Sequence, residues 1–153
     1  MEIVGVPKDK IFNSQYFLNF QWRYICNFEI MQNILSTAVP SVGPFSSAVQ
    51  SGDFLFFSGQ IGVDNKGQLA DGFEGEVHQA LGNIRSILAE QNLDFSHIVS
   101  ITIYLDNMKN YKTLNEIYRT YFTDRFPART CIAVAELPLH AQIELTVTAT
   151  LKK

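Results

Sequence analysis

Cysteine is scarce in this 153-residue chain, which contains only Cys26 and Cys131. A small domain that depends on disulfides needs a larger set of cysteines. The three histidines are scattered at His78, His97 and His140. No pair of Cys or His residues has the spacing of metal ligands. These shortages predict a reduced, cytosolic protein without a metal site.

Positive charge and long apolar runs are also in short supply. The chain has 12 Lys and Arg against 15 Asp and Glu, a net charge of −3, and a pI of about 5.5. Without a basic stripe for several phosphate contacts, a nucleic-acid partner is not expected. No apolar run approaches the roughly 20 residues of a membrane span. A hydrophobic content of 46% with 18% charged residues favours one soluble globular domain.

The first thirty residues differ from the rest of the chain. They are rich in aromatic residues, but these recur with a period of neither 2 nor 3.6. They also lack the basic start, continuous apolar stretch and small-residue cleavage site of a signal peptide. We therefore predict that residues 1–30 are an extension outside the fold, disordered or produced by a misassigned start codon, and that residues 31–153 form the domain.

Clear periodicities begin after Met31. Alternating apolar and polar residues predict strands, and apolar residues at helical spacing predict helices. The strands are expected at 45–50, 54–58, 99–106, 130–137 and 142–151, and the helices at 73–91 and 111–122. This β-β-α-β-α-β-β order predicts an α+β fold, in which two helices cover one face of a mostly antiparallel sheet.

The opposite face of that sheet is expected to be rich in threonine and nearly free of charge. Its expected members are Thr102, Tyr104, Thr146, Thr148 and Thr150. Such a face suits burial against another subunit, because weakly polar side chains pack while their hydroxyls still find partners. A solvent-exposed threonine face is the alternative. Glu144 is the lone carboxylate at the start of this face.

Two charged residues stand at the beginnings of successive strands. Arg129 follows a proline turn and shares a face with Cys131, and Glu144 opens the next strand. If these strands pair in antiparallel fashion, the guanidinium and the carboxylate come close together. The pair then binds an anionic substrate beside a proton acceptor, or it forms a structural salt bridge. Spacing alone favours the salt bridge.

Several motifs resemble those of one family. They are Ser41-Val42-Gly43-Pro44-Phe45, Ser58-Gly59-Gln60-Ile61, Asn115-Glu116-Ile117-Tyr118 with Phe122, Phe126-Pro127-Ala128-Arg129, Glu136-Leu137-Pro138 and Ile143-Glu144. On these motifs, residues 31–153 resemble the reactive intermediate deaminase A (RidA) family, also called the YjgF or L-PSP endoribonuclease family.

The resemblance implies a chorismate-mutase-like fold and a homotrimer with active sites between subunits. It also implies a cytoplasmic hydrolase of C–N bonds that works without a cofactor or metal. The implied substrates are reactive 2-imino acids and their enamines, such as 2-iminobutanoate and 2-iminopropanoate, and the products are 2-oxo acids and ammonia. Pyridoxal-phosphate enzymes release such imines, so the implied role is the control of metabolite damage.

The resemblance also assigns roles to single residues. Arg129 is expected to bind the substrate carboxylate, Glu144 to position or deprotonate the water, and the Cys131 backbone to orient the water or the imine nitrogen. Nucleophilic attack by the Cys131 thiol is not favoured, because no histidine stands at a partner position. The remaining expected substrate-binding residues are Phe45, Ser58, Gly59 and Asn115; Phe45 replaces the family's usual tyrosine, which removes a hydroxyl from the wall.

Two other functions remain open for such a chain. Members of the family have been described as endoribonucleases or translation inhibitors, although the acidic pI argues against phosphate binding here. The alternative is a non-enzymatic trimer that binds small carboxylates or acts as a chaperone-like surface. Retention of Glu144 together with Arg129 favours chemistry, because a carboxylate beside the site hurts simple anion binding.

Overall fold

The computed structural model describes residues 32–35 and 43–152. Contacts between Cα atoms divide the chain into residues 1–31 and 32–153. The predicted extension at residues 1–30 lies outside the described residues. Everything that follows concerns the second unit.

Seven strands of this unit form a single sheet, and two helices accompany it. The sheet order is β1 (Gln32–Leu35), β2 (Ala48–Ser51), β3 (Phe54–Phe57), β7 (Ile143–Thr150), β5 (Ile98–Leu105) and β6 (Ala128–Ala133), and β4 (Gln60–Ile61) also pairs with β7. The helices are α2 (Gly72–Glu90) and α3 (Tyr111–Tyr121). All of these strand pairs are antiparallel except β5 with β6.

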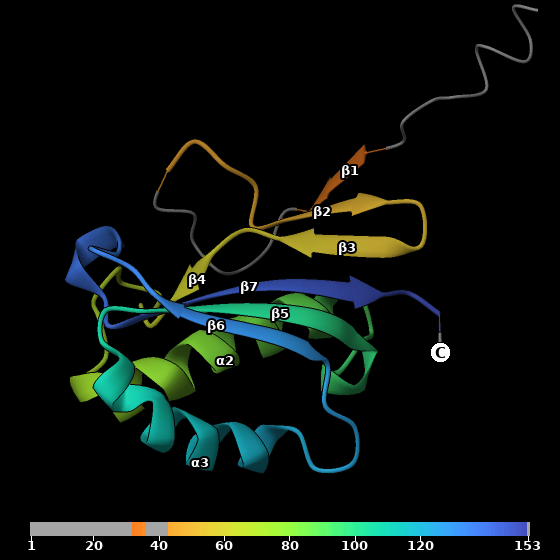
Figure 1. Cartoon of the computed structure of the whole chain (residues 1–153). Helices are drawn as coiled ribbons and strands as arrows, with labels where there is room; N and C mark the ends of the chain where they lie inside the picture. The colour runs from red at the N-terminus through yellow and green to blue at the C-terminus, as the bar shows by residue number, and fades with distance from the viewer. Residues whose placement is uncertain (1–31, 36–42, 153) are drawn as a thin grey trace, which may run out of the picture. The chain divides into compact units, whose positions relative to one another are not determined.

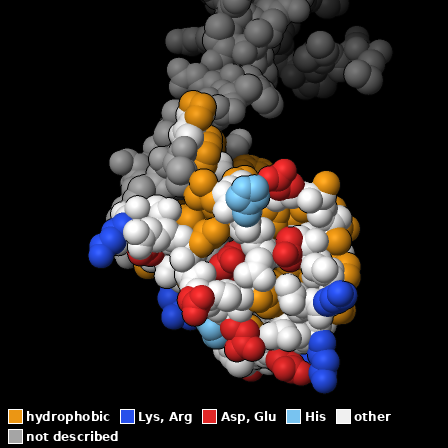
Figure 2. All heavy atoms as spheres, turned by 90° about the vertical axis from the view of Figure 1, so that its left-hand side faces the viewer, with side chains coloured by type: hydrophobic (Ala, Val, Ile, Leu, Met, Phe, Trp, Pro, Cys, Tyr) orange, Lys and Arg blue, Asp and Glu red, His pale blue; other side chains and the backbone are white. Residues whose placement is uncertain are grey.

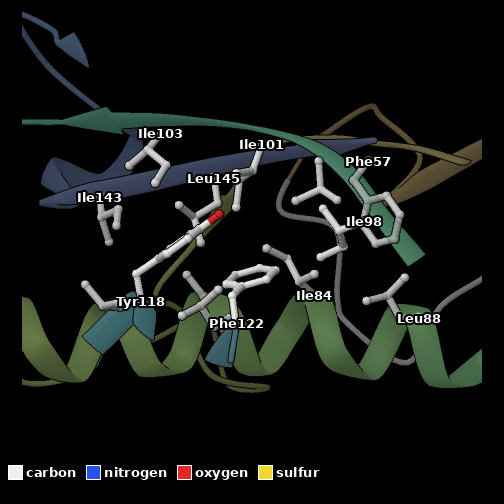
Figure 3. Packing of buried hydrophobic residues seen from close by; sticks show 14 of the residues in the cluster. Phe57, Ile84, Leu88, Ile98, Ile101, Ile103, Tyr118, Phe122, Ile143 and Leu145 are labelled. Atoms are coloured by element: carbon white, nitrogen blue, oxygen red, sulfur yellow. The ribbon is translucent and has the colours of Figure 1, made fainter. Parts of the chain in front are cut away.

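Both helices lie on the same side of the β5–β7 part of the sheet (Figure 1). Alternate residues of β7 turn toward them, so Ile143, Leu145, Val147 and Ala149 are buried. The apolar residues that recur along α2 meet this face, among them Ile84 and Leu88, as Figure 3 shows. Burial of each large aliphatic side chain contributes about 1.5–3 kcal/mol, and this layer is the main core.

The α+β architecture and the two helices were correctly predicted from the sequence. The bounds of α2 and α3 lie within one residue of the expected 73–91 and 111–122. The helices cover the Ile, Leu and Val face of the sheet as expected, because helix and strand periodicities both report which side of an element meets the core. The strands β1 and β4 were not predicted.

The prediction for the strand that carries Arg129 was wrong in two respects. We expected it at 130–137, in antiparallel pairing with the last strand. It spans Ala128–Ala133 and pairs in parallel with β5. The reason is the intervening helix: β5, α3 and β6 form a crossover unit, which returns the chain in the same direction. After β6 the chain turns through Pro138–His140 and enters β7 on the other side of β5.

Candidate functional site

Arg129 lies on β6 and is held by helix α3. Its Nη1 donates a hydrogen bond to Oδ1 of Asn115 at 2.8 Å, and its Nη2 donates one to the Tyr111 hydroxyl at 3.1 Å. The guanidinium carbon also lies 4.9 Å from the centroid of the Tyr118 ring. A planar cation is stabilised over an aromatic face. The helix therefore fixes the guanidinium in one orientation, and Asn115 supports Arg129 directly.

A cavity opens beside this arginine. Its volume is about 290 Å³, and we call it the arginine cavity; it is lined by Asn115, Tyr118, Arg119, Phe126, Pro127 and Arg129. Within residues 32–35 and 43–152, no carboxylate forms an ion pair with Arg129. The positive charge of Arg129 is therefore available to an anion, and a guanidinium suits a carboxylate because it can donate two parallel hydrogen bonds.

Cys131 follows two residues after Arg129 and shares its side of the sheet. The thiol is half-buried and packs against the main core. Burial raises the pKa of Cys131, and the nearby charge of Arg129 opposes this effect only in part. The sulfur is therefore protonated near neutral pH, which disfavours nucleophilic attack by this thiol, since the thiolate is the reactive form.

Glu144 lies on β7, and its carboxylate rests against the backbone of Gly59. A Cβ atom on Gly59 would overlap Oε1 of Glu144, so only glycine allows this approach. Burial raises the pKa of Glu144. A carboxylate with a raised pKa accepts a proton more readily, so this arrangement suits a general base. Glu144 and Gly59, which the family resemblance assigns to one site, thus lie side by side.

A second cavity surrounds Glu144, with a volume of about 390 Å³. We call it the glutamate cavity; its lining consists of Phe45, Ser47, Ser58, Gly59, Gln60, Ile61, Val63, Pro138, Leu139 and Glu144. The predicted substrate-binding residues Phe45, Ser58 and Gly59 are all in this lining. Glu144 is the only ionisable side chain among them.

The loops around the glutamate cavity are fixed by hydrogen bonds of Ser58. Its hydroxyl donates to the Ser46 carbonyl oxygen at 2.6 Å, and its backbone N–H donates to the Ser47 carbonyl oxygen at 3.0 Å. These bonds tie the segment before β2 to the segment after β3. Phe45 is thereby placed at the rim of the cavity with 49% of its surface exposed.

Two buried polar residues of helix α2 hold the backbone of segments next to the glutamate cavity. Glu76 is 3% exposed, and its carboxylate accepts hydrogen bonds from the backbone N–H and the side-chain Nε2 of Gln142 at 2.8 and 2.9 Å. Asn83 donates to the carbonyl oxygens of Ile61 and Val63 at 3.2 and 3.0 Å. Sequence reasoning missed both residues. A polar residue in register with the apolar stripe of the helix is the signal that could have revealed Asn83.

Arg129 and Glu144 do not meet within one chain. Arg129 is in register with Ile101 of β5, whereas Glu144 is in register with Tyr104, three residues further along. With two strand spacings between them, their Cα atoms are roughly 14 Å apart. The guanidinium contacts α3 on one face of the sheet, and Glu144 alternates with the buried Ile143 and Leu145 on the other.

The expected proximity of this pair, and the alternative of a salt bridge between them, are therefore both wrong within a single chain. Because β6 is parallel to β5 and is separated from β7 by it, strand pairing cannot bring the two residues together. Arg129 and Asn115 line one half of a candidate site, the arginine cavity, whereas Cys131 packs against the core and lines neither cavity. Glu144, Phe45, Ser58 and Gly59 form the other half.

Figure 2 shows the end of the molecule that carries the loop between β6 and β7, which lies at the left in Figure 1. Hydrophobic side chains there are interspersed with separate carboxylates, and Lys and Arg side chains lie toward the margins of the view. Among residues 43–152, no group of three His, Cys, Asp or Glu side chains is arranged to hold a metal ion. The helices in this part of the chain are too short or too polar for a membrane span.

Comparison with known proteins adds to this geometry. A family model described as Endoribonuclease L-PSP matches residues 35–151. The chain is 44% identical over 123 residues to a RutC family protein of Aquifex aeolicus, covering 78% of this chain and 98% of that protein. It is 40% identical over 124 residues to the 2-iminobutanoate/2-iminopropanoate deaminase of mouse, covering 78% and 92%. A solved putative endoribonuclease from Thermotoga maritima superposes with a TM-score of 0.76 at 33% identity, covering 80% and 100%.

Proposed function

This chain belongs to the RidA/YjgF family, also described as endoribonuclease L-PSP, and on that premise we propose that it hydrolyses 2-imino acids to 2-oxo acids and ammonia. The expected substrates are 2-iminobutanoate and 2-iminopropanoate, and the reaction breaks a C–N bond without a cofactor or metal. The observation that carries the proposal is Glu144, a half-buried carboxylate of raised pKa inside a cavity with no other ionisable side chain in its lining.

The protein does not need to activate the substrate strongly, because the substrate is an iminium carboxylate whose C2 is already electrophilic. Glu144 removes a proton from water as the water oxygen attacks C2, and the electrons of the C=N bond move to nitrogen. Glu144 then returns this proton to the nitrogen, and the C–N bond breaks as the new hydroxyl becomes a carbonyl. The hydroxyl proton leaves with the ammonia, so the products are the 2-oxo acid and ammonium.

The other residues orient the substrate in this proposal. Arg129, steadied by Asn115, binds the substrate carboxylate through two hydrogen bonds. The backbone at Cys131 orients the water or the imine nitrogen. Ser58 and Phe45 shape the wall opposite, and Gly59 leaves room for the Glu144 carboxylate. Correct placement of reactants is a large part of such a rate enhancement.

A complete site then requires a second copy of the chain, and we propose a homotrimer of the chorismate-mutase-like type. Two observations support it. Arg129 and Glu144 open onto separate cavities, so the arginine cavity of one copy must face the glutamate cavity of the next. The sheet face opposite the helices also exposes Phe54, Phe56 and Ile132 at 44–49% of their surfaces, among partly exposed threonines. Large exposed apolar patches of this kind mark interaction surfaces.

We place this activity in the cytoplasm, where it removes reactive imines that pyridoxal-phosphate enzymes release. The free thiol at Cys131 is compatible with that reducing compartment. Endoribonuclease activity is the second candidate, because the matching family model carries that description. RNA binding needs several cationic phosphate contacts, whereas the glutamate cavity offers none.

The test couples the protein to threonine dehydratase, which supplies 2-iminobutanoate, in the presence of semicarbazide as a trap for the free imine. Wild-type protein should lower semicarbazone formation and accelerate release of 2-oxobutanoate. Arg129→Ala and Glu144→Ala should each abolish this effect. Light scattering on the same samples should give the mass of a trimer. Equal rates with and without wild-type protein would contradict the proposal, and cleavage of a single-stranded RNA instead would favour the endoribonuclease.

A further inference from the structure

The turn that leads into β7 has an unusual backbone. Leu139 has φ 56° and ψ 19°, and His140 has φ 59°. Both residues are therefore in the left-handed region, which is disfavoured for residues with a Cβ atom and is rarely occupied by a leucine. Strain of this kind persists only where the surrounding structure imposes it, and it is concentrated at functional sites.

Both ends of this turn are anchored. Leu137 is 7% exposed and Ala141 is 1% exposed, and both belong to a small buried cluster. The His140 N–H donates to the Leu137 carbonyl oxygen, and the Ala141 N–H donates to the Pro138 carbonyl oxygen, both at 3.1 Å. With its ends fixed, the turn does not bury Leu139. Half of this side chain is exposed, and it lines the glutamate cavity.

The lining of the glutamate cavity indicates which part of a substrate contacts Leu139. The apolar side chains of Phe45, Ile61, Val63, Pro138 and Leu139 make up half of its lining, and Glu144 supplies its single charge. A negative charge in an apolar cavity repels a carboxylate but attracts an iminium group. The cavity of about 390 Å³ corresponds to on the order of a dozen water molecules, which is more space than a methyl group needs.

From these observations we propose that Leu139, together with Phe45, selects 2-imino acids with bulky apolar side chains, such as those derived from leucine and phenylalanine. This inference rests on the proposed function, and within that substrate class it ranks bulky apolar 2-imino acids above 2-iminobutanoate and 2-iminopropanoate. The substrate carboxylate lies on Arg129 of a neighbouring copy, its iminium carbon lies beside Glu144, and its side chain lies in the glutamate cavity against Leu139. The strained turn thus places the apolar side chain of Leu139 against the substrate.

The test measures kcat/KM for imines generated by an amino-acid oxidase from alanine, 2-aminobutyrate, leucine and phenylalanine. Each methylene that moves from water into an apolar cavity improves binding roughly four-fold. The leucine-derived imine should therefore exceed the alanine-derived one by roughly ten-fold or more in wild type. Leu139→Asn keeps a similar size and tolerates the left-handed backbone, but it removes the apolar surface. It should lower this ratio at least roughly three-fold.

Met108→Asn is the matched control, because Met108 is 45% exposed and lines neither cavity. This control should leave the ratio unchanged. A ratio equally unchanged in Leu139→Asn would overturn the inference. A variant that loses its oligomeric state and slows on all four imines alike would also overturn it, because Leu139 would then be an interface contact. If wild type hydrolyses none of the imines, the proposed function fails, and this inference fails with it.

Discussion

The carboxylate of Glu144 lies directly against Gly59, so that Oε1 occupies the space which a β-carbon at position 59 would need. The two residues are far apart in the sequence, and they meet because β4 pairs with β7 in a register that places Ile61 opposite Glu144. The backbone of the Ser58–Gly59 turn is therefore one wall of the carboxylate's environment. The Glu144 carboxylate can take this position because residue 59 is a glycine and has no side chain.

Gly59→Ala should displace the Glu144 carboxylate and lower the rate of imine hydrolysis. A positioned general base is worth roughly 10²–10⁴-fold, and most of that factor should be lost. Gly82→Ala is the matched control, since a Cβ at Gly82 has nothing within 4 Å and the residue lies inside α2. The control should keep full activity and gain roughly 0.5–1 kcal/mol of stability. Steady-state kinetics and thermal unfolding measure both; full activity in Gly59→Ala would show that this contact is dispensable.

The activity should depend on the protonation of Glu144. Because burial raises its pKa above the ordinary value of 4.5, the acidic limb of the kcat/KM profile should lie above that value, with activity rising as the carboxylate loses its proton. Glu144→Gln should lower the rate strongly and remove the acidic limb from the activity that remains. A residual rate that keeps the same limb would assign it to another group.

The raised pKa of Glu144 also has a consequence for stability. The folded state binds the proton more tightly than the unfolded state, so this group's contribution is fully present below 4.5 and is lost as the pH rises through the folded pKa. Above that window Glu144→Gln should unfold at a temperature no lower than wild type does. Thermal unfolding at several pH values measures the difference, and a variant that is less stable only at high pH would contradict the sign.

Arg129 should bind the substrate carboxylate more weakly when a second carboxylate is placed beside it. Asn115→Asp is nearly isosteric and still accepts the 2.8 Å hydrogen bond from Nη1, but its charge competes with the carboxylate of the substrate. We expect KM to rise roughly ten-fold or more, as for the loss of a charge-assisted hydrogen bond. Asn115→Ala serves as the comparison, because it removes the support without adding charge and should raise KM less. Equal KM values in the two variants would argue against carboxylate binding at Arg129.

Tyr118 should tolerate the loss of its hydroxyl. Its oxygen is buried, has no hydrogen-bond partner among residues 32–35 and 43–152, and points toward the sheet near Leu145 (Figure 3). Burial raises the pKa of Tyr118 to about 12, despite the nearby charge of Arg129. Tyr118→Phe removes an unpaired polar atom and should raise the free energy of unfolding by up to about 1–3 kcal/mol, while the ring still supports the guanidinium.

Tyr121→Phe is the comparison for that substitution. The Tyr121 hydroxyl is bonded to Nδ1 of His78 at 2.7 Å, so its removal should cost about 0.5–1.5 kcal/mol. Denaturant unfolding of both variants gives the two differences. A loss of stability in Tyr118→Phe comparable to that in Tyr121→Phe would mean that the buried hydroxyl has a partner after all.

Much of the secondary structure, and which side of each element is buried, could be predicted from the amino-acid sequence. The alternation along Ile143–Thr150 assigned each side chain to a face, and it placed Glu144 on the face away from the helices. The spacing in Gly72–Glu90 predicted the helix and its buried side. The motifs around Arg129, Gly59 and Glu144 indicated the family. Each of these signals is local, because side-chain periodicity within one element reports which side of it meets the core.

The meeting of distant residues was decided only by the tertiary structure. Parallel pairing of β6 with β5 placed Arg129 and Glu144 on opposite faces and divided the candidate site into two halves. Contacts between elements also brought the buried Glu76 to Gln142 and anchored both ends of the turn in which Leu139 is left-handed. Periodicity assigns faces within a strand, but it carries no information about which strand lies beside it. That choice depends on the crossover through α3 and on how both helices pack against the sheet.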